Sequence, residues 1–168
     1  MNELPALATR LEGAIADLLA LRPRVEAAAP WPLAELYGTE AEASWGPPEL
    51  LAHLDEMLPF WLGEAELILD GSGEAPVDFG RIAADTVRIG IIGRDRTIPL
   101  RELFARLSAE GARVAARMRD MSDDDAARDG RHPVRGTYTV AGMLERYVIT
   151  HLEEHVIQLQ EILTARGA

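Results

Sequence analysis

Two histidines one helical turn apart are the strongest chemical signal in this sequence. The run HLEEH places His151 and His155 four residues apart, so on a helix both imidazoles project from the same face. This is a spacing that paired metal ligands use. The same face continues the apolar line of Leu144, Val148 and Leu159, so the pair points partly into the protein. An imidazole buried among leucines needs a partner for each ring nitrogen, and a metal ion supplies one.

A third histidine separates a metal site from a chance pair. Taken alone, the pair could equally arise by chance or make hydrogen bonds within its helix. His53 lies in ELLAHLDEM at the edge of an apolar stripe, beside Met57 and Phe60, and alone it fits a satisfied core or boundary histidine. However, three of the four histidines occupy inward or half-inward positions on two helices that can pack together. We therefore predict that His53, His151 and His155 bind one divalent metal ion.

The composition narrows the identity of this ion. The chain has no cysteine, so disulfides and thiolate ligands are excluded, and a metal must be held by His, Asp or Glu. Three neutral imidazoles suit Zn²⁺, Ni²⁺ or Fe²⁺, and they suit Ca²⁺ and Mg²⁺ poorly because those ions prefer oxygen ligands. The sequence does not choose among the first three. An incomplete protein shell would leave positions for water or substrate, as in a catalytic site.

Several polar and aromatic residues are candidates for the surroundings of the metal. Trp45 and Trp61 could line a pocket, although core packing or capping of one end of the helices is the favoured interpretation. Side chains that could orient the imidazoles, although glutamates on a helix are more often simply solvated, are Glu56, Glu64, Glu154 and Gln158.

Two residues outside the predicted long helices could also contribute. His132 lies in RHPVRGTY, where a role in a loop or turn is favoured over that of a fourth ligand. Arg81, in DFGRIAAD, could bind an anionic group of a substrate, or it could form a structural ion pair with Asp85 at helical spacing.

Four long amphipathic segments must position these residues. Apolar positions at spacings of three and four predict a first helix from Leu4 to Val25, a second over about 48–70, a third from Pro99 to Met118, and a fourth over about 139–165 with Thr139 as its N-cap. The glycine-rich stretch 72–96 is long, which suits a crossover between helices that run in the same direction, or a loop that walls a pocket. A charged loop follows the third helix. Without a strand pattern or a repeat, we predict an all-α four-helix bundle.

Composition and charge bound the class of protein. A chain of 168 residues, 48% hydrophobic and 27% charged, fits one domain with a continuous core, over 1–168. The net charge of −11, with no lysine and no basic cluster, argues against nucleic-acid binding. The first residues mix charges among apolar positions, which predicts neither a signal peptide nor a membrane span and indicates a soluble protein. The absence of cysteine points to a cytoplasmic protein. Dinucleotide, phosphate-loop and nucleophile-elbow motifs are missing.

Three segments carry a resemblance to a known family. The segments WGPPELLAHLDEM, HPVRGTYTVAGML and HLEEHVIQL resemble the DinB-like superfamily, which includes the YfiT-type proteins and the mycothiol-dependent maleylpyruvate isomerases. The resemblance extends from about Leu4 to Leu163. It implies a four-helix bundle with an unusual crossover between its second and third helices, a homodimer, and a metal bound by one histidine of the second helix and an HxxxH pair of the fourth. Those positions fall on His53, His151 and His155.

The resemblance also implies a chemistry. Its members use a metal together with a low-molecular-weight thiol, as in thiol S-transferases and isomerases that act on small molecules. The isomerases resemble this pattern with a glutamate in the fourth-helix pair, whereas this chain has histidine at both places. Three hypotheses follow: a metal-dependent enzyme that activates either a thiol or a water molecule for hydrolysis, a non-catalytic stress-associated metal-binding protein, and a helical interaction module without a metal.

Overall fold

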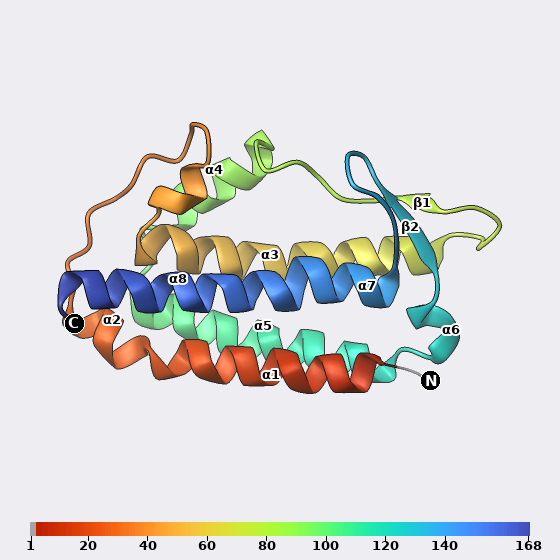
Figure 1. The fold of residues 1–168 in the computed structure, drawn as a ribbon, viewed down its shortest axis with the longest axis horizontal. Helices are drawn as coiled ribbons and strands as arrows, with labels where there is room; N and C mark the ends of the chain where they lie inside the picture. Colours follow the sequence, from red (N-terminus) through yellow and green to blue (C-terminus); the bar gives the residue numbers. More distant parts are fainter. Residues whose placement is uncertain (1–2) are drawn as a thin grey trace.

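The computed structural model describes residues 3–168, and most of them are helical (Figure 1). The first long segment consists of α1 (Leu4–Ala20) and α2 (Arg22–Ala27). The second is α3 (Pro47–Asp70) and the third is α5 (Leu100–Asp120). The fourth joins α7 (Val140–Leu144), the π-helical turn η2 (Glu145–Thr150) and α8 (His151–Arg166). Three short helices complete the set: η1 (Ala41–Ser44), α4 (Thr86–Asp95) and α6 (Asp123–Ala126).

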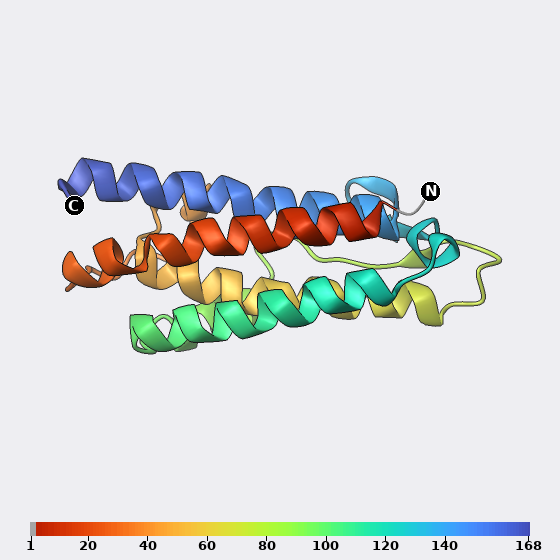
Figure 2. The ribbon, with the colours of Figure 1, turned by 90° about the horizontal axis from the view of Figure 1, so that it is seen from below.

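The four long segments lie side by side, two running in one direction and two in the opposite direction (Figures 1 and 2). Helices α3 and α5 run in one direction, while α1 and α8 run in the opposite one. Helix α1 packs against α5 and α8, and α3 packs against the same two helices. Because α3 and α5 are parallel, the chain between them must return along the length of the molecule, as the long glycine-rich stretch predicted.

The core is formed by the apolar stripes of all four segments. Leu11, Leu54, Phe104 and Leu152 come from different segments, and each is at most 1% exposed. Burying one such side chain contributes roughly 1.5–3 kcal/mol to the stability of the fold. This core can therefore stabilise the helix packing without disulfides. A smaller apolar cluster packs α4 against the start of α3, and it contains Trp45, Leu50, Ala52, Ile89 and Ile92.

A buried carboxylate fixes the irregular segment 28–46 to the start of α3. Glu49 is fully buried, and its side chain accepts hydrogen bonds from the amides of Ala34 (3.0 Å) and Gly46 (3.2 Å). It also pairs with Arg96, at the end of α4, at 3.2 Å. One side chain therefore holds segment 28–46, α3 and α4 in a fixed relation, and all three contribute to the site described below.

A small sheet corrects the prediction of an all-α fold and of a loop after the third helix. Strand β1 (Val77–Asp78) pairs in parallel with β2 (Asp129–His132), and β2 pairs in antiparallel with β3 (Gly136–Thr139). These strands have two to four mostly polar residues, so they lack the alternation that would reveal a strand in the sequence. Gly130 lies opposite Val77 and Tyr138, and Ile68 and Phe79 pack so closely on it that a larger residue would require one of these side chains to shift.

The fourth segment contains a wider turn just before the histidine pair. Its predicted N-cap is confirmed, since the hydroxyl of Thr139 accepts a hydrogen bond from the amide of Gly142 at 3.0 Å. Buried positions then recur every four residues, a repeat that drifts by about 40° per step around a regular α-helix. The π-helical turn offsets part of this drift and keeps the apolar line on the core. These buried residues are Val140, Leu144, Val148, Leu152 and Val156.

Over residues 3–168, none of the helices combines the length and the apolar composition that a membrane crossing would require.

Candidate metal centre

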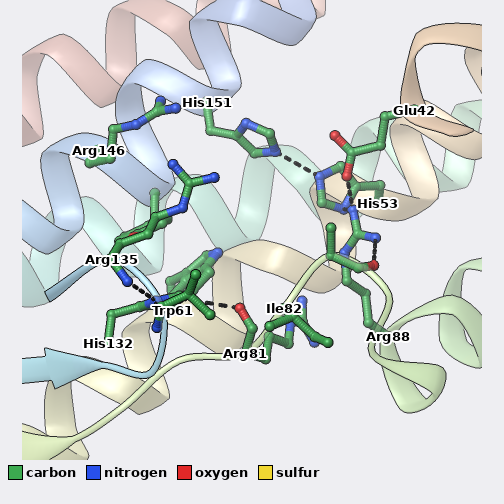
Figure 3. A pocket seen from close by; sticks show the side chains of 13 residues that line it. Glu42, His53, Trp61, Arg81, Ile82, Arg88, His132, Arg135, Arg146 and His151 are labelled. Carbon is green, nitrogen blue, oxygen red and sulfur yellow. Dashed lines mark hydrogen bonds and ion pairs between the residues drawn. The ribbon is translucent and has the colours of Figure 1, made fainter. Parts of the chain in front are cut away.

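The structure brings the three predicted ligands together. His53 projects from the second turn of α3, and His151 and His155 project from the first two turns of α8. Figure 3 shows His53 and His151 pointing toward each other. The Nε2 atom of His151 lies 3.0 Å from Nε2 of His53 and 3.1 Å from Nε2 of His155. Together with a carboxylate oxygen of Glu42, one ligand atom of each residue lies within 4.8 Å of the others.

Glu42 is the member of this group that the sequence analysis missed. It comes from η1, in segment 28–46, and its carboxylate lies 3.8 Å from Nε2 of His155. The backbone carbonyl of Glu42 accepts a hydrogen bond from the amide of Gln158 at 2.8 Å, and its carboxylate pairs with Arg88. Nothing in the local run TEAEAS separates Glu42 from a solvated glutamate, because both contacts join segments far apart in the sequence.

Hydrogen bonds on the far side of the rings fix two of the three imidazoles as acceptors. Because Gln158 donates through its nitrogen to a carbonyl, its oxygen faces Nδ1 of His155, at 2.9 Å. Nδ1 of His151 faces a carboxylate oxygen of Glu154 at 3.3 Å. Each Nδ1 therefore carries the proton, and each Nε2 presents a lone pair.

Two lone pairs thus oppose each other at 3.1 Å, with no proton to share between the neutral rings of His151 and His155. A divalent cation bound by both nitrogens removes this repulsion, so the donor set fits the ion that the sequence predicted. An arrangement of three converging imidazoles suits Zn²⁺, Ni²⁺ or Fe²⁺.

The third ring, His53, lies between a carboxylate and a guanidinium group. Its Nδ1 lies 3.9 Å from a carboxylate oxygen of Glu56 and 3.4 Å from a guanidinium nitrogen of Arg88. A proton on Nδ1, directed at Glu56, leaves Nε2 as a third lone pair. A hydrogen bond from Arg88 selects the other tautomer, in which Nε2 donates to His151. The two neighbours therefore decide between a ligand form and a form that hydrogen bonds to His151.

Burial keeps all three histidines neutral. Loss of solvation lowers the pKa of His53 well below its ordinary value, and the neighbouring His155 and Arg88 add to the effect. Burial and the adjacent His151 lower the pKa of His155 to about 4. The pKa of His151 is lowered by burial, with partial opposition from Glu42. Neutral imidazole is the form that binds a metal ion, so at pH 7 the cluster needs to release no protons.

A cavity of about 360 Å³ opens beside His53, His151 and Glu42. This volume lies in the range of small-molecule sites. On its wall, the ring of Trp61 stacks on Tyr147 with centroids 4.5 Å apart. Figure 3 shows the side chains of Arg81, Arg88, Arg135 and Arg146 around the same space.

The residues predicted to surround the metal divide into two groups. Glu154 and Gln158 contact the histidines directly, and Glu56 adjoins His53. Glu64 instead accepts a hydrogen bond from the amide of Gly80 at 2.5 Å, which ties the crossover to α3. Trp45 packs edge-on against His53, with centroids 5.7 Å apart, and Trp61 lines the cavity.

His132 lies at the cavity but outside the cluster, and it ends strand β2 instead of lying in a loop. Its Nε2 donates to the carbonyl of Arg81 at 3.2 Å, while Nδ1 accepts from the amides of Val134 (3.2 Å) and Arg135 (3.3 Å). Both ring nitrogens are thus satisfied by the backbone, which agrees with the structural role favoured from the sequence.

The alternative ion pair between Arg81 and Asp85 is wrong. Arg81 pairs with the buried carboxylate of Glu56, at 2.5 and 2.7 Å. Asp85 instead caps α4 by accepting from the amide of Arg88 at 2.9 Å. The two residues precede the helix, so the helical spacing assumed for them does not apply.

Fold and site together define a mostly helical protein with a candidate metal centre beside a pocket. The family model of the DinB superfamily matches residues 9–159, so the chain belongs to that superfamily. A search of curated proteins gave no match. Among solved structures, the chain is similar to YfiT from Bacillus subtilis, with 19% identity, a TM-score of 0.71, and coverage of 98% of this chain and 87% of that one. YfiT is described as a probable metal-dependent hydrolase with an unusual four-helix bundle topology.

Proposed function

We propose that the chain binds one divalent metal ion through Nε2 of His53, His151 and His155, and that it is a metal-dependent enzyme acting on small molecules. The observation that carries this proposal is the opposed pair of lone pairs on the half-buried His151 and the buried His155, 3.1 Å apart. Zn²⁺, Ni²⁺ and Fe²⁺ are the ions that this donor set favours.

Hydrolysis is the first candidate reaction. A metal bound here would supply Lewis acidity that activates water. Glu42 places a carboxylate 3.8 Å from His155 Nε2 at the wall of the cavity, where it can accept a proton from a reacting group. Arg88 holds this carboxylate in place. The description of YfiT as a probable metal-dependent hydrolase supports the same choice.

A thiol-dependent S-transferase or isomerase is the second candidate. The cavity leaves room for another molecule beside the histidines, and the chain has no cysteine of its own. A thiol would therefore come from a low-molecular-weight cofactor. The same metal would favour its thiolate form.

Metal content is the first test. Protein purified without added chelator is expected to carry close to one metal ion per chain, measured by element-resolved mass spectrometry. His53→Ala and His155→Ala should lose it. His132→Gln serves as the control, because it removes a histidine from the same cavity but not from the cluster. Wild-type protein that binds none of the three ions on reconstitution would favour the interaction module without a metal.

Activity is the second test. Metal-loaded and metal-stripped proteins are compared on an activated ester, and on an electrophile with an added low-molecular-weight thiol. Hydrolysis that depends on metal and not on thiol supports the first candidate, and dependence on both supports the second. Equal rates for loaded and stripped protein in every reaction would leave the non-catalytic, stress-associated metal-binding protein.

We further infer that residues 1–168 form a single domain, a four-helix bundle of DinB/YfiT type, and that it works as a homodimer in the cytoplasm. The family resemblance supports the bundle and the dimer. The net charge of −11 supports small-molecule partners over nucleic acid. Size-exclusion chromatography with light scattering measures the oligomeric state.

A further inference from the structure

The cavity beside the candidate metal centre has a charge opposite to that of the whole chain. The protein has a net charge of −11, yet the cavity wall contains four arginines and one acidic residue, Glu42. In a small, partly enclosed space such a wall attracts anions, and a divalent ion at the histidines would strengthen the attraction.

Two of the four arginines are already committed to structural contacts. Arg81 directs both terminal nitrogens at the carboxylate of Glu56. Arg88 donates to the carbonyl of Ala83 at 2.8 Å and pairs with Glu42. Their side chains are only 10% and 6% exposed, so these pairs have little contact with water and remain in place.

The other two arginines keep donors available. Arg135, in the turn between β2 and β3, forms no ion pair with any carboxylate of the described part of the chain. Arg146, in the π-helical turn, has one contact of 3.4 Å with Glu154. Figure 3 shows both side chains at the cavity, on the side of His151. A planar guanidinium can bind a carboxylate or a phosphate with two parallel hydrogen bonds.

The same cavity has an apolar part. Ile82 and Val134 are 53% and 72% exposed, and both line it. Behind them, Trp61 and Tyr147 form the stacked pair described above. Exposed aliphatic side chains next to cations that keep donors available indicate a ligand with an apolar body and a charged end.

We propose that the ligand of this cavity is a small anion with an apolar body, whose carboxylate or phosphate binds Arg135 and Arg146. The inference rests on the proposed function and names its substrate class. A cavity of about 360 Å³ takes a small molecule and not a polymer. Arg135 and Arg146 thereby act as binding residues that direct the anionic end of the ligand beside the histidines.

Three probes of similar size test this class: benzoate, phenyl phosphate and uncharged benzamide. Binding to the metal-loaded wild-type protein is measured by ligand-observed NMR titration. At least one of the two anions is expected to bind about tenfold more tightly than benzamide, because charge-assisted hydrogen bonds are stronger than hydrogen bonds between neutral groups. The better anion identifies carboxylate or phosphate as the group. Inorganic phosphate should bind more weakly than phenyl phosphate, since it lacks the apolar body. Equal binding of both anions and benzamide would overturn the proposal.

Arginine variants locate the site. Arg135→Gln and Arg146→Gln should each weaken binding of the better anion by about tenfold, with benzamide unaffected. Arg113→Gln is the matched control: it removes the same charge from the exposed face of α5, where Arg113 pairs with Glu110. If Arg113→Gln weakened anion binding as much as the other two, the effect would be one of net charge and the proposed site would be wrong.

Metal content measured on the same samples keeps this proposal separate from the proposed function. Metal near one per chain in wild type and in both arginine variants, without selective anion binding, overturns the anion site and leaves the metal centre intact. Selective anion binding that depends on Arg135 and Arg146, in protein that binds no metal, supports the anion site and overturns the proposed function.

Discussion

His132 and His151 line the same cavity, and His155 contacts His151, yet the ring nitrogens of His132 and those of the His151–His155 pair have different partners. Both nitrogens of His132 are hydrogen bonded to the backbone, one as donor and one as acceptor. In the pair, Nδ1 of each ring is held by a side chain, and the two Nε2 atoms face each other. Burial is similar for His132 and His155, at 4% and 5% exposed. Burial alone therefore does not distinguish a ligand from a structural histidine, whereas the accounting of donors and acceptors does.

Replacing one histidine of each kind should give the largest contrast. His155→Ala should weaken metal binding by more than the 10- to 100-fold that loss of an outer partner costs, because it removes a ligand. His132→Ala should keep the metal and instead lower the free energy of unfolding by about 1–3 kcal/mol, since three backbone groups lose a buried partner. Metal titration and denaturant unfolding of both variants measure the two effects. Loss of metal from His132→Ala in its folded state would break the distinction.

The side chain behind His155 should have the next largest effect. Gln158→Leu removes the acceptor that keeps the proton on Nδ1, so metal affinity should fall by about 10- to 100-fold. It also removes the bond to the carbonyl of Glu42. Gln160→Leu, two residues further along the exposed side of α8, is the matched control. Unchanged affinity in Gln158→Leu would show that the tautomer of His155 is set by another contact.

The histidine positions could be predicted from the sequence because they depend on local regularity. His151 and His155 sit one turn apart on a long, strongly periodic helix, and His53 sits on another, so inward orientation follows from spacing alone. The same regularity gave the bounds of the four long helical segments.

Residues in the connections could not be predicted in this way. Glu42 lies in segment 28–46 and approaches His155, and Arg88 of α4 pairs with Glu42. These contacts depend on how distant segments pack, and no periodic pattern encodes them. The predicted ion pair between Arg81 and Asp85 was wrong because it assumed helical spacing in a segment that is not helical. The sheet was missed since its strands are short and polar.

Acid stability should also separate the two kinds of histidine, to a smaller extent. The pKa of His155 is lowered from 6.5 to about 4 in the folded protein, so between these pH values the unfolded state binds the extra proton. Stability of the metal-free protein is therefore complete above pH 6.5 and falls as the pH drops, by up to about 1.4 kcal/mol per pH unit for one such group.

The measurement is denaturant unfolding from pH 7 to pH 4 in the presence of a chelator. His155→Gln should flatten the pH dependence, because glutamine does not ionise. His132→Gln should flatten it less, because the pKa of His132 is lowered by burial but supported by the carbonyl of Arg81. Equal flattening in the two variants would contradict the distinction between their environments.

The smallest effect should come from Asp55 on α3, whose contribution to the pH dependence of stability is opposite to that of the histidines. Burial raises its pKa to about 6, with Arg106 opposing the shift, so below pH 6 the folded state binds a proton that the unfolded state binds only near pH 3.8. Asp55 therefore adds stability as the pH falls from 6 to 4, against the loss caused by the histidines. Asp55→Asn removes this compensation and should steepen the acid loss by at most about 1 kcal/mol, since partial exposure screens the group. Unfolding curves of wild type and Asp55→Asn at pH 7, 5.5 and 4 measure it. A shallower curve for the variant would mean that the carboxyl of Asp55 remains ionised in the folded protein.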